Sequence, residues 1–195
     1  MAMQTEVSIA PSETQIVSSL QFATTGLVAL HGPGTLAIAL SVIAQLAACR
    51  GPVWVVDGGN CFDALWIARH LAASGLVPGP VLGRIHVSRA FTCHQLVERL
   101  LSLSPYMCPL VVLGLLDTFY DENVRLPEVR RLLNRTWPAL HSRSRTSLVA
   151  VTLQLPGTAA QEGRAQLYHT FVRLADRAVS LPPVPEATPQ LSFWR

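Results

Sequence analysis

A glycine-rich turn that leads into an apolar segment is where phosphate chemistry would first be expected. Residues 31–40 read HGPGTLAIAL. A phosphate-binding loop of the form G-x-x-x-x-G-K-[ST] wraps phosphates in backbone N–H groups, neutralises them with its lysine and holds magnesium with its hydroxyl. Here a single proline, which has no N–H, separates the two glycines, and no lysine precedes the threonine. The turn is read either as a vestigial nucleotide loop or as an ordinary strand-to-helix turn, and it comprises His31, Gly32, Pro33, Gly34 and Thr35.

The composition removes several kinds of chemistry. All 15 basic residues are arginine, against 12 acidic residues, which gives a formal net charge of +3. Without lysine, a Schiff base, a lysine general base or a phosphate-loop lysine is not available. The cysteines at 49, 61, 93 and 108 form no C-x-x-C pair, and the neighbouring Cys93 and His94 lack ligand spacing. We therefore expect no metal site, no cofactor and no cysteine nucleophile.

Length and hydropathy indicate one folded domain. Half of the 195 residues are hydrophobic and 14% are charged, which is too apolar for a disordered chain. We expect a single domain at 26–195, after a partly ordered N-terminal extension at 1–25. The uncharged stretch 27–49 is long enough to suggest a membrane span, but the glycine–proline turn leaves about 15 apolar residues after it, too few to cross a bilayer. The N-terminal residues do not resemble a secretory signal, so a cytoplasmic location is expected.

Alternating apolar strands and helices predict the fold class. Strands are expected at 26–30, 52–56, 84–87, 110–115 and 148–153, with helices between them at 35–48, 62–73, 92–103 and 126–143. Strands that are apolar throughout and alternate with helices form right-handed crossover units. We predict an α/β fold with a doubly wound, mainly parallel sheet and helices on both faces. A strand at 175–181 and the terminal LSFWR are expected to form a short antiparallel C-terminal extension.

Several of these units resemble the RecA and RadA-type recombinases and their eukaryotic paralogues. The resemblance is carried by HVSRAFTCHQLVERLL at 86–101, through Arg89-Ala90-Phe91 and His94-Gln95, and by VVDGGNCFDALWIARHLA at 55–72. It continues through PLVVLGLLDTFYDENVRLPEVRRLLNRTWPAL at 109–140 and VAVTLQ, which ends at Gln154. The resemblance implies a RecA-like ATPase fold.

The departures from that family concern hydrolysis. The resemblance implies a loop lysine, a water-activating glutamate after the second strand and a magnesium-binding aspartate at the end of the fourth. The lysine is absent, Gly59 stands where the glutamate is expected and Gly114 where the aspartate is expected. A shifted alignment could let Asp117 serve as the aspartate, but none supplies a lysine. Losing groups that stabilise transferring charge costs several kcal/mol of transition-state stabilisation, so we predict a pseudo-ATPase rather than an enzyme.

Arginines gather on and beside the helix expected at 126–143. They are Arg125, Arg130, Arg131, Arg135, Arg143 and Arg145. In the recombinases, DNA is contacted by loops after the fourth and fifth strands, where this chain offers Arg125 and Arg164. The helical arginines could bind phosphates on another face, or they could form a solvated helix surface.

The sequence thus leads to one main hypothesis and two others. The first is an inactive RecA-like accessory protein in DNA recombination or repair, whose partner is a recombinase or another paralogue, with DNA as a further candidate and a heterodimer or small oligomer as its form. The second is an interaction or regulatory module without DNA affinity, with Phe193 and Trp194 as a candidate anchor. The third is an unrelated enzyme that uses Asp57, Asp117 and His31 at the strand ends. Separately, Asp117, Asp121 and Glu122 gather beyond a strand end, where catalytic carboxylates occur, but they also suit a polar loop in which Asp121 or Asn123 caps the next helix.

Overall fold

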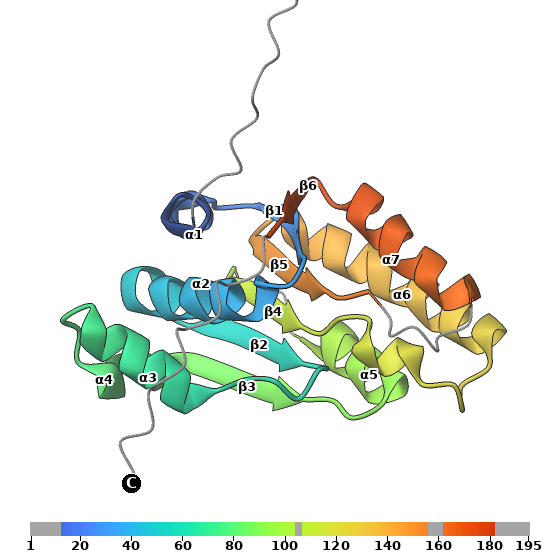
Figure 1. The fold of residues 1–195 in the computed structure, drawn as a ribbon, viewed down its shortest axis with the longest axis horizontal. Helices are drawn as coiled ribbons and strands as arrows, with labels where there is room; N and C mark the ends of the chain where they lie inside the picture. The colour runs from blue at the N-terminus through green and yellow to red at the C-terminus, as the bar shows by residue number, and fades with distance from the viewer. Residues whose placement is uncertain (1–12, 104–106, 156–161, 182–195) are drawn as a thin grey trace, which may run out of the picture.

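The structure is a computed structural model, and it describes residues 13–103, 107–155 and 162–181. Parallel strands alternate with helices through most of this range (Figure 1). The strands are β1 Gly26–His31, β2 Val53–Asp57, β3 Ile85–Arg89, β4 Leu110–Leu113, β5 Leu148–Leu153 and β6 Arg177–Ser180. The helices are α1 Glu13–Phe22, α2 Thr35–Arg50, α3 Ala64–Ala73, α4 Pro78–Leu82, α5 Cys93–Ser102, the 3₁₀ helix η1 Asp117–Tyr120, α6 Leu126–Ser144 and α7 Glu162–Leu174.

Local chemistry fixes several of these boundaries. The Asp63 carboxylate accepts a hydrogen bond from the Trp66 N–H, so α3 begins at Ala64 rather than at the predicted residue 62. Thr92 caps α5 in the same way, through a bond from the Gln95 N–H. Pro127 lies in the first turn of α6, where a missing N–H costs nothing. The predicted strands and the helices predicted between them are thus present, whereas α1, α4 and η1 were not predicted.

The six strands form one parallel sheet in the order β3-β2-β4-β5-β1-β6. This order is compatible with a P-loop-like fold, and it brings the ends of β2 and β4 side by side. Because all strands run in one direction, the residues that follow them meet at one edge. The turn after β1 lies at that same edge.

The predicted antiparallel extension is wrong. Strand β6 pairs with β1 in parallel, with Val28 opposite Arg177 and His31 opposite Ser180. The reason is α7, a helix of 13 residues between β5 and β6, which is long enough for a crossover that returns the chain to the same end of the sheet. The terminal LSFWR lies outside the described residues.

Helices cover the two faces of the sheet in two groups. Helices α1 to α4 pack on one face and α5 to α7 on the other; in Figure 1 the first group lies on the left and the second on the right. Successive strand residues alternate between the two cores: Val28 and Leu30 belong to the first, Leu27 and Ala29 to the second. Burial on both faces explains why these strands are apolar along their length.

The described part of the N-terminal extension joins the first core. Ile16 and Leu20 on α1 are buried and pack with residues of α2. Helix α2 itself is apolar nearly all round because it is covered by α1, by α3 and by the sheet. Within the described ranges, no helix is both long enough and apolar enough to cross a membrane.

Candidate functional site

The turn after β1 is short and folded upon itself. Strand β1 ends at His31 and α2 begins at Thr35, so three residues connect them. The Thr35 N–H and hydroxyl both donate hydrogen bonds to the Gly32 carbonyl oxygen, which lies 3.3 Å from the Thr35 amide nitrogen. Since Pro33 has no N–H and the Thr35 N–H is used inside the turn, this loop cannot present the wrap of donors that phosphates require.

The C-terminal end of β6 also closes on this turn. Gly32 has a φ of 107°, and a Cβ placed on it would lie 2.2 Å from the Leu181 carbonyl oxygen. The Leu181 N–H donates to the His31 carbonyl at 2.7 Å. Glycine is needed at position 32 for both its backbone angle and this close approach. The second glycine of the turn, Gly34, is the N-cap of α2 and provides no side-chain cap.

His31 is held by α7. Its Nδ1 lies 3.0 Å from the Tyr168 hydroxyl, and the two rings meet edge to face. Burial lowers the pKa of His31, because desolvation disfavours the imidazolium. A cleft of about 270 Å³ beside this pair is lined by Gly32, Pro33, Gln154, Leu155 and Tyr168. His31 therefore links β1 to α7.

The two glycines at the expected catalytic positions contact each other. A Cβ placed on Gly114 would lie 2.7 Å from both the Cα and the N of Gly59 and 2.5 Å from Oδ2 of Asp117. The N–H groups of Gly58 and Gly59 both donate to the Leu113 carbonyl, at 2.8 and 3.2 Å. The backbone after β2 is thus bonded to the end of β4, which leaves no room for an acidic side chain at position 114.

Asp57 and Asp117 lie at this edge but in different settings. Asp57 is fully buried, and its carboxylate accepts bonds from the N–H groups of Cys61 and Phe62 at 3.0 and 3.1 Å. Arg89 Nε lies 3.5 Å from the same carboxylate. These contacts make Asp57 a structural anchor for the loop after β2. Burial and the charge of Asp57 raise the pKa of Asp117.

Asp117 lines a wider cleft of about 470 Å³. Its walls also include Gly59, Asn60, Phe91 and Tyr120. Within the described ranges, no group of three His, Cys, Asp or Glu side chains is placed to hold a metal ion. The third hypothesis required His31, Asp57 and Asp117 to act together. Because His31 is bonded to Tyr168 and Asp57 to its own loop, the contacts do not join these three residues in one catalytic arrangement.

The six arginines around α6 divide by environment. Arg143 is half-buried and donates to the Cys108 carbonyl at 3.1 Å, and burial lowers its pKa. Arg131 is exposed but bonded to Glu128. The other four are exposed, and they are Arg125, Arg130, Arg135 and Arg145. Arg164, which the resemblance placed in a DNA-contacting loop, is 1% exposed and donates to the carbonyls of Phe119 and Val124. It holds the η1 segment against α7.

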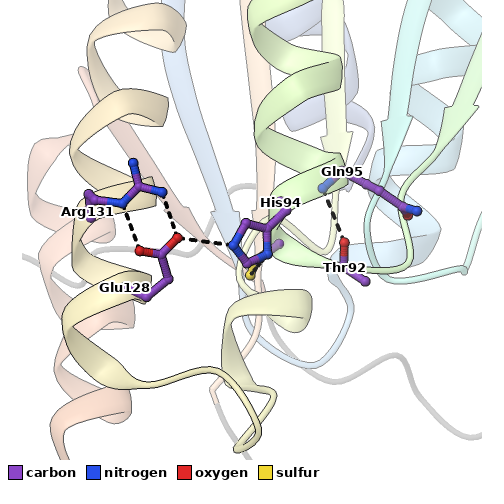
Figure 2. Close-up of polar contacts among 6 residues, drawn as sticks. Thr92, His94, Gln95, Glu128 and Arg131 are labelled. Atoms are coloured by element: carbon purple, nitrogen blue, oxygen red, sulfur yellow. Dashed lines mark hydrogen bonds and ion pairs between the residues drawn. The ribbon is translucent and has the colours of Figure 1, made fainter.

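A polar cluster joins α5 to α6. Arg131 binds the Glu128 carboxylate through two hydrogen bonds, each 2.7 Å long, and His94 Nε2 lies 3.1 Å from Glu128 Oε1 (Figure 2). These bonds lower the pKa of Glu128 to about 2, with Arg131 the main cause. A paired arginine offers less to a phosphate than a free one, so the Glu128 carboxylate neutralises part of the arginine surface.

The same cluster resembles a thiol–imidazole–carboxylate row. Cys93 Sγ lies 3.6 Å from His94 Nδ1, while the opposite ring nitrogen faces Glu128 (Figure 2). Cys93 is fully buried, however, and burial raises its pKa. A buried, protonated thiol is a poor nucleophile. The arrangement is therefore a contact between helices rather than a catalytic row.

The chain matches no protein-family model and no curated protein. The fold stands as a parallel α/β sheet with no family assigned to it. Sequence reasoning missed the pairing of Glu128 with Arg131, although their three-residue spacing on a helix was a usable signal. It also missed the burial of Arg164, for which the sequence holds no comparable signal.

Proposed function

We propose that the protein is a catalytically inactive, RecA-like accessory protein in DNA recombination or repair that acts through its surfaces. Two observations support the proposal. The turn after β1 and the strand ends at Gly59 and Gly114 are tightly packed, and residues 26–155 resemble recombinases. A turn of three residues follows β1, and Gly59 packs on Gly114 where acidic groups would be needed. A fold that lacks these groups can still hold an oligomeric or partner interface.

This proposal predicts that purified protein does not turn over ATP. The assay is steady-state phosphate release with Mg-ATP, at protein concentrations that would reveal a slow enzyme. Hydrolysis that disappears in both Thr35→Ala and Asp117→Asn would contradict the proposal, because it would place chemistry at this edge. A matched control is Thr170→Ala, which alters a threonine that bonds within α7.

Contact with DNA is a second candidate, and the exposed arginines of α6 favour it. Arg125, Arg130, Arg135 and Arg145 are exposed, and no carboxylate bond is made by any of them among the described residues. Such a surface binds phosphates with an affinity that falls steeply with salt. Arg164 contributes nothing to it, since its guanidinium lies inside the fold.

Fluorescence anisotropy of labelled single- and double-stranded DNA at two salt concentrations tests this candidate. Binding that weakens with salt and is indifferent to Mg-ATP would support DNA contact. Absence of binding at low salt would remove DNA from the proposal and leave a protein partner. Exchanging Arg135 for glutamine should weaken binding, whereas the same change at Arg69, on the opposite face of the sheet, should not.

A further inference from the structure

An apolar groove lies between α6 and α7, which run side by side in Figure 1. Its volume is about 410 Å³. The Trp137 and Phe171 rings meet edge to face, with centroids 5.5 Å apart, and Leu174 is 46% exposed. The side chains that matter here are Leu133, Trp137, Leu167, Phe171, Leu174 and Arg130. Leu133 and Phe171 are buried and form its floor, whereas Leu174 is exposed and Trp137 and Leu167 are partly exposed, so part of this apolar surface is open to a partner.

The length and the walls of the groove suit the binding of a helix. Its lining residues run from Arg130 to Pro138 on α6 and from Leu167 to Leu174 on α7. At a rise of 1.5 Å per residue these walls are about 12 and 10 Å long, or two helical turns. Both walls are helices, whose backbone groups are bonded internally, so a partner strand would find no ladder to join. Side chains spaced i, i+3, i+4 and i+7 on a partner helix match this length.

The positive charge around the groove favours a partner with acidic residues. Arg130 is among its lining residues, and Arg135 and Arg173 are exposed on the same two helices. None of the described residues that line the groove is acidic. Glu128, near the start of α6, is already bonded to Arg131 and His94. A partner that fills the apolar floor would therefore gain from carboxylates on its flanks.

We propose that this groove binds an amphipathic helix of a partner protein, with leucine-like residues facing Trp137 and Phe171 and acidic residues facing Arg130. The inference deepens the proposed accessory role by naming the partner surface. Only the expectation that the partner acts in recombination depends on that proposed role. Binding at the groove does not involve the turn after β1 or the glycines at the ends of β2 and β4.

The test uses a synthetic, helix-stapled peptide with leucine at i, i+3, i+4 and i+7 and glutamate on both flanks. Binding to the full chain is followed by NMR of the tryptophan indole N–H groups, with Trp137 assigned from a Trp137→Phe variant. We expect a selective shift of the Trp137 signal. We also expect binding about tenfold tighter than that of a matched peptide with lysine in place of glutamate. An unmoved Trp137 signal, or equal affinity for both peptides, overturns the proposal.

Two matched pairs of variants separate the apolar and charged contributions. Leu174→Gln should weaken the glutamate peptide about tenfold, whereas Leu65→Gln, at a comparably exposed leucine on α3, should not. Arg130→Glu should reverse the preference between the two peptides, and Arg69→Glu should leave it unchanged. ATP hydrolysis would refute the pseudo-ATPase without altering these results, while loss of peptide binding would refute the groove alone. Displacement of the peptide by DNA would overturn the assignment to a protein helix, because it would show that phosphates occupy the arginines.

Discussion

Gly59 and Gly114 stand in backbone contact where the ends of β2 and β4 meet, so that a Cβ on Gly114 would lie 2.7 Å from the Gly59 nitrogen. The contact joins the two positions, 59 and 114, at which the sequence lacks the acidic residues that the resemblance to recombinases implies. With glycine at both positions the two strand ends lie close together, and no room is left for an acidic side chain at position 114. Asp117 then occupies the remaining volume, with its carboxylate near both glycines.

Replacing Gly114 should therefore cost more than its backbone angle alone requires. Its φ is 61°, which a residue with a Cβ adopts only under strain. Gly75 has a similar φ of 75°, but a Cβ added there would have no neighbour within 4 Å, so Gly75→Ala measures the strain by itself. We expect about 1 kcal/mol of lost stability for Gly75→Ala and roughly 2 to 4 kcal/mol for Gly114→Ala. Urea unfolding compares them, and equal losses would show that the contact with Gly59 is unimportant.

The charge state of Asp117 should make stability depend on pH. Because burial and Asp57 raise its pKa in the folded protein, the native state holds a proton at pH values where the unfolded chain has lost it. The contribution of protonated Asp117 to the free energy of unfolding is fully present at pH values below its ordinary pKa of 3.8. This contribution is lost as the pH rises through the pKa of the folded state. Asp117→Asn should thus be more stable than the parent at pH 7, with an advantage that shrinks in acid.

Asp121 provides a control because its pKa is shifted in the opposite direction from that of Asp117. Hydrogen bonds from the Asn123 backbone and side chain lower its pKa, so its contribution is present above the ordinary value of 3.8 and is lost as the pH falls through the lowered one. Asp121→Asn should be less stable than the parent at pH 7. Thermal unfolding of both variants across pH 3 to 8 gives the comparison. Two variants that shift in the same direction would refute the assigned environments.

The fold was largely predictable because its signals are local, whereas the candidate site was not. Apolar runs such as 148–153 predicted strands buried on both faces, and the polar residues between them predicted the turns. The Gly59–Gly114 contact depends on β2 lying beside β4, which only the strand order determines. Arg164 was predicted on a surface loop, but it bonds to carbonyls more than 35 residues away along the chain. The direction of β6 was predicted wrongly, because it depends on the crossover through α7 between β5 and β6.

Freeing Arg131 should strengthen any contact between α6 and DNA. Glu128 holds this guanidinium in two hydrogen bonds, and Glu128→Gln removes the charge while keeping the size of the side chain. If α6 binds DNA, the variant should bind more tightly, and its logarithmic salt slope should steepen by about one. Glu98→Gln makes the same change of charge at an exposed position on α5 and serves as the control. An equal gain in both variants would indicate only a change in net charge.

Thiol reactivity tests the burial at the edge of the sheet without any assumption about function. Burial and the nearby charges of Asp57 and Asp117 raise the pKa of Cys61 to about 12, and burial is the main cause that raises the pKa of Cys93. The thiolate is the reactive form, so both residues should react far more slowly with iodoacetamide at pH 8 than the exposed Cys49. Mass spectrometry of peptides sampled over time measures each rate in one experiment. Labelling should become uniform in denaturant, which removes burial and the neighbouring carboxylates together. Rapid labelling of Cys61 in the native protein would mean that the loop after β2 opens, and that the Asp57 anchor is weaker than its two backbone hydrogen bonds indicate.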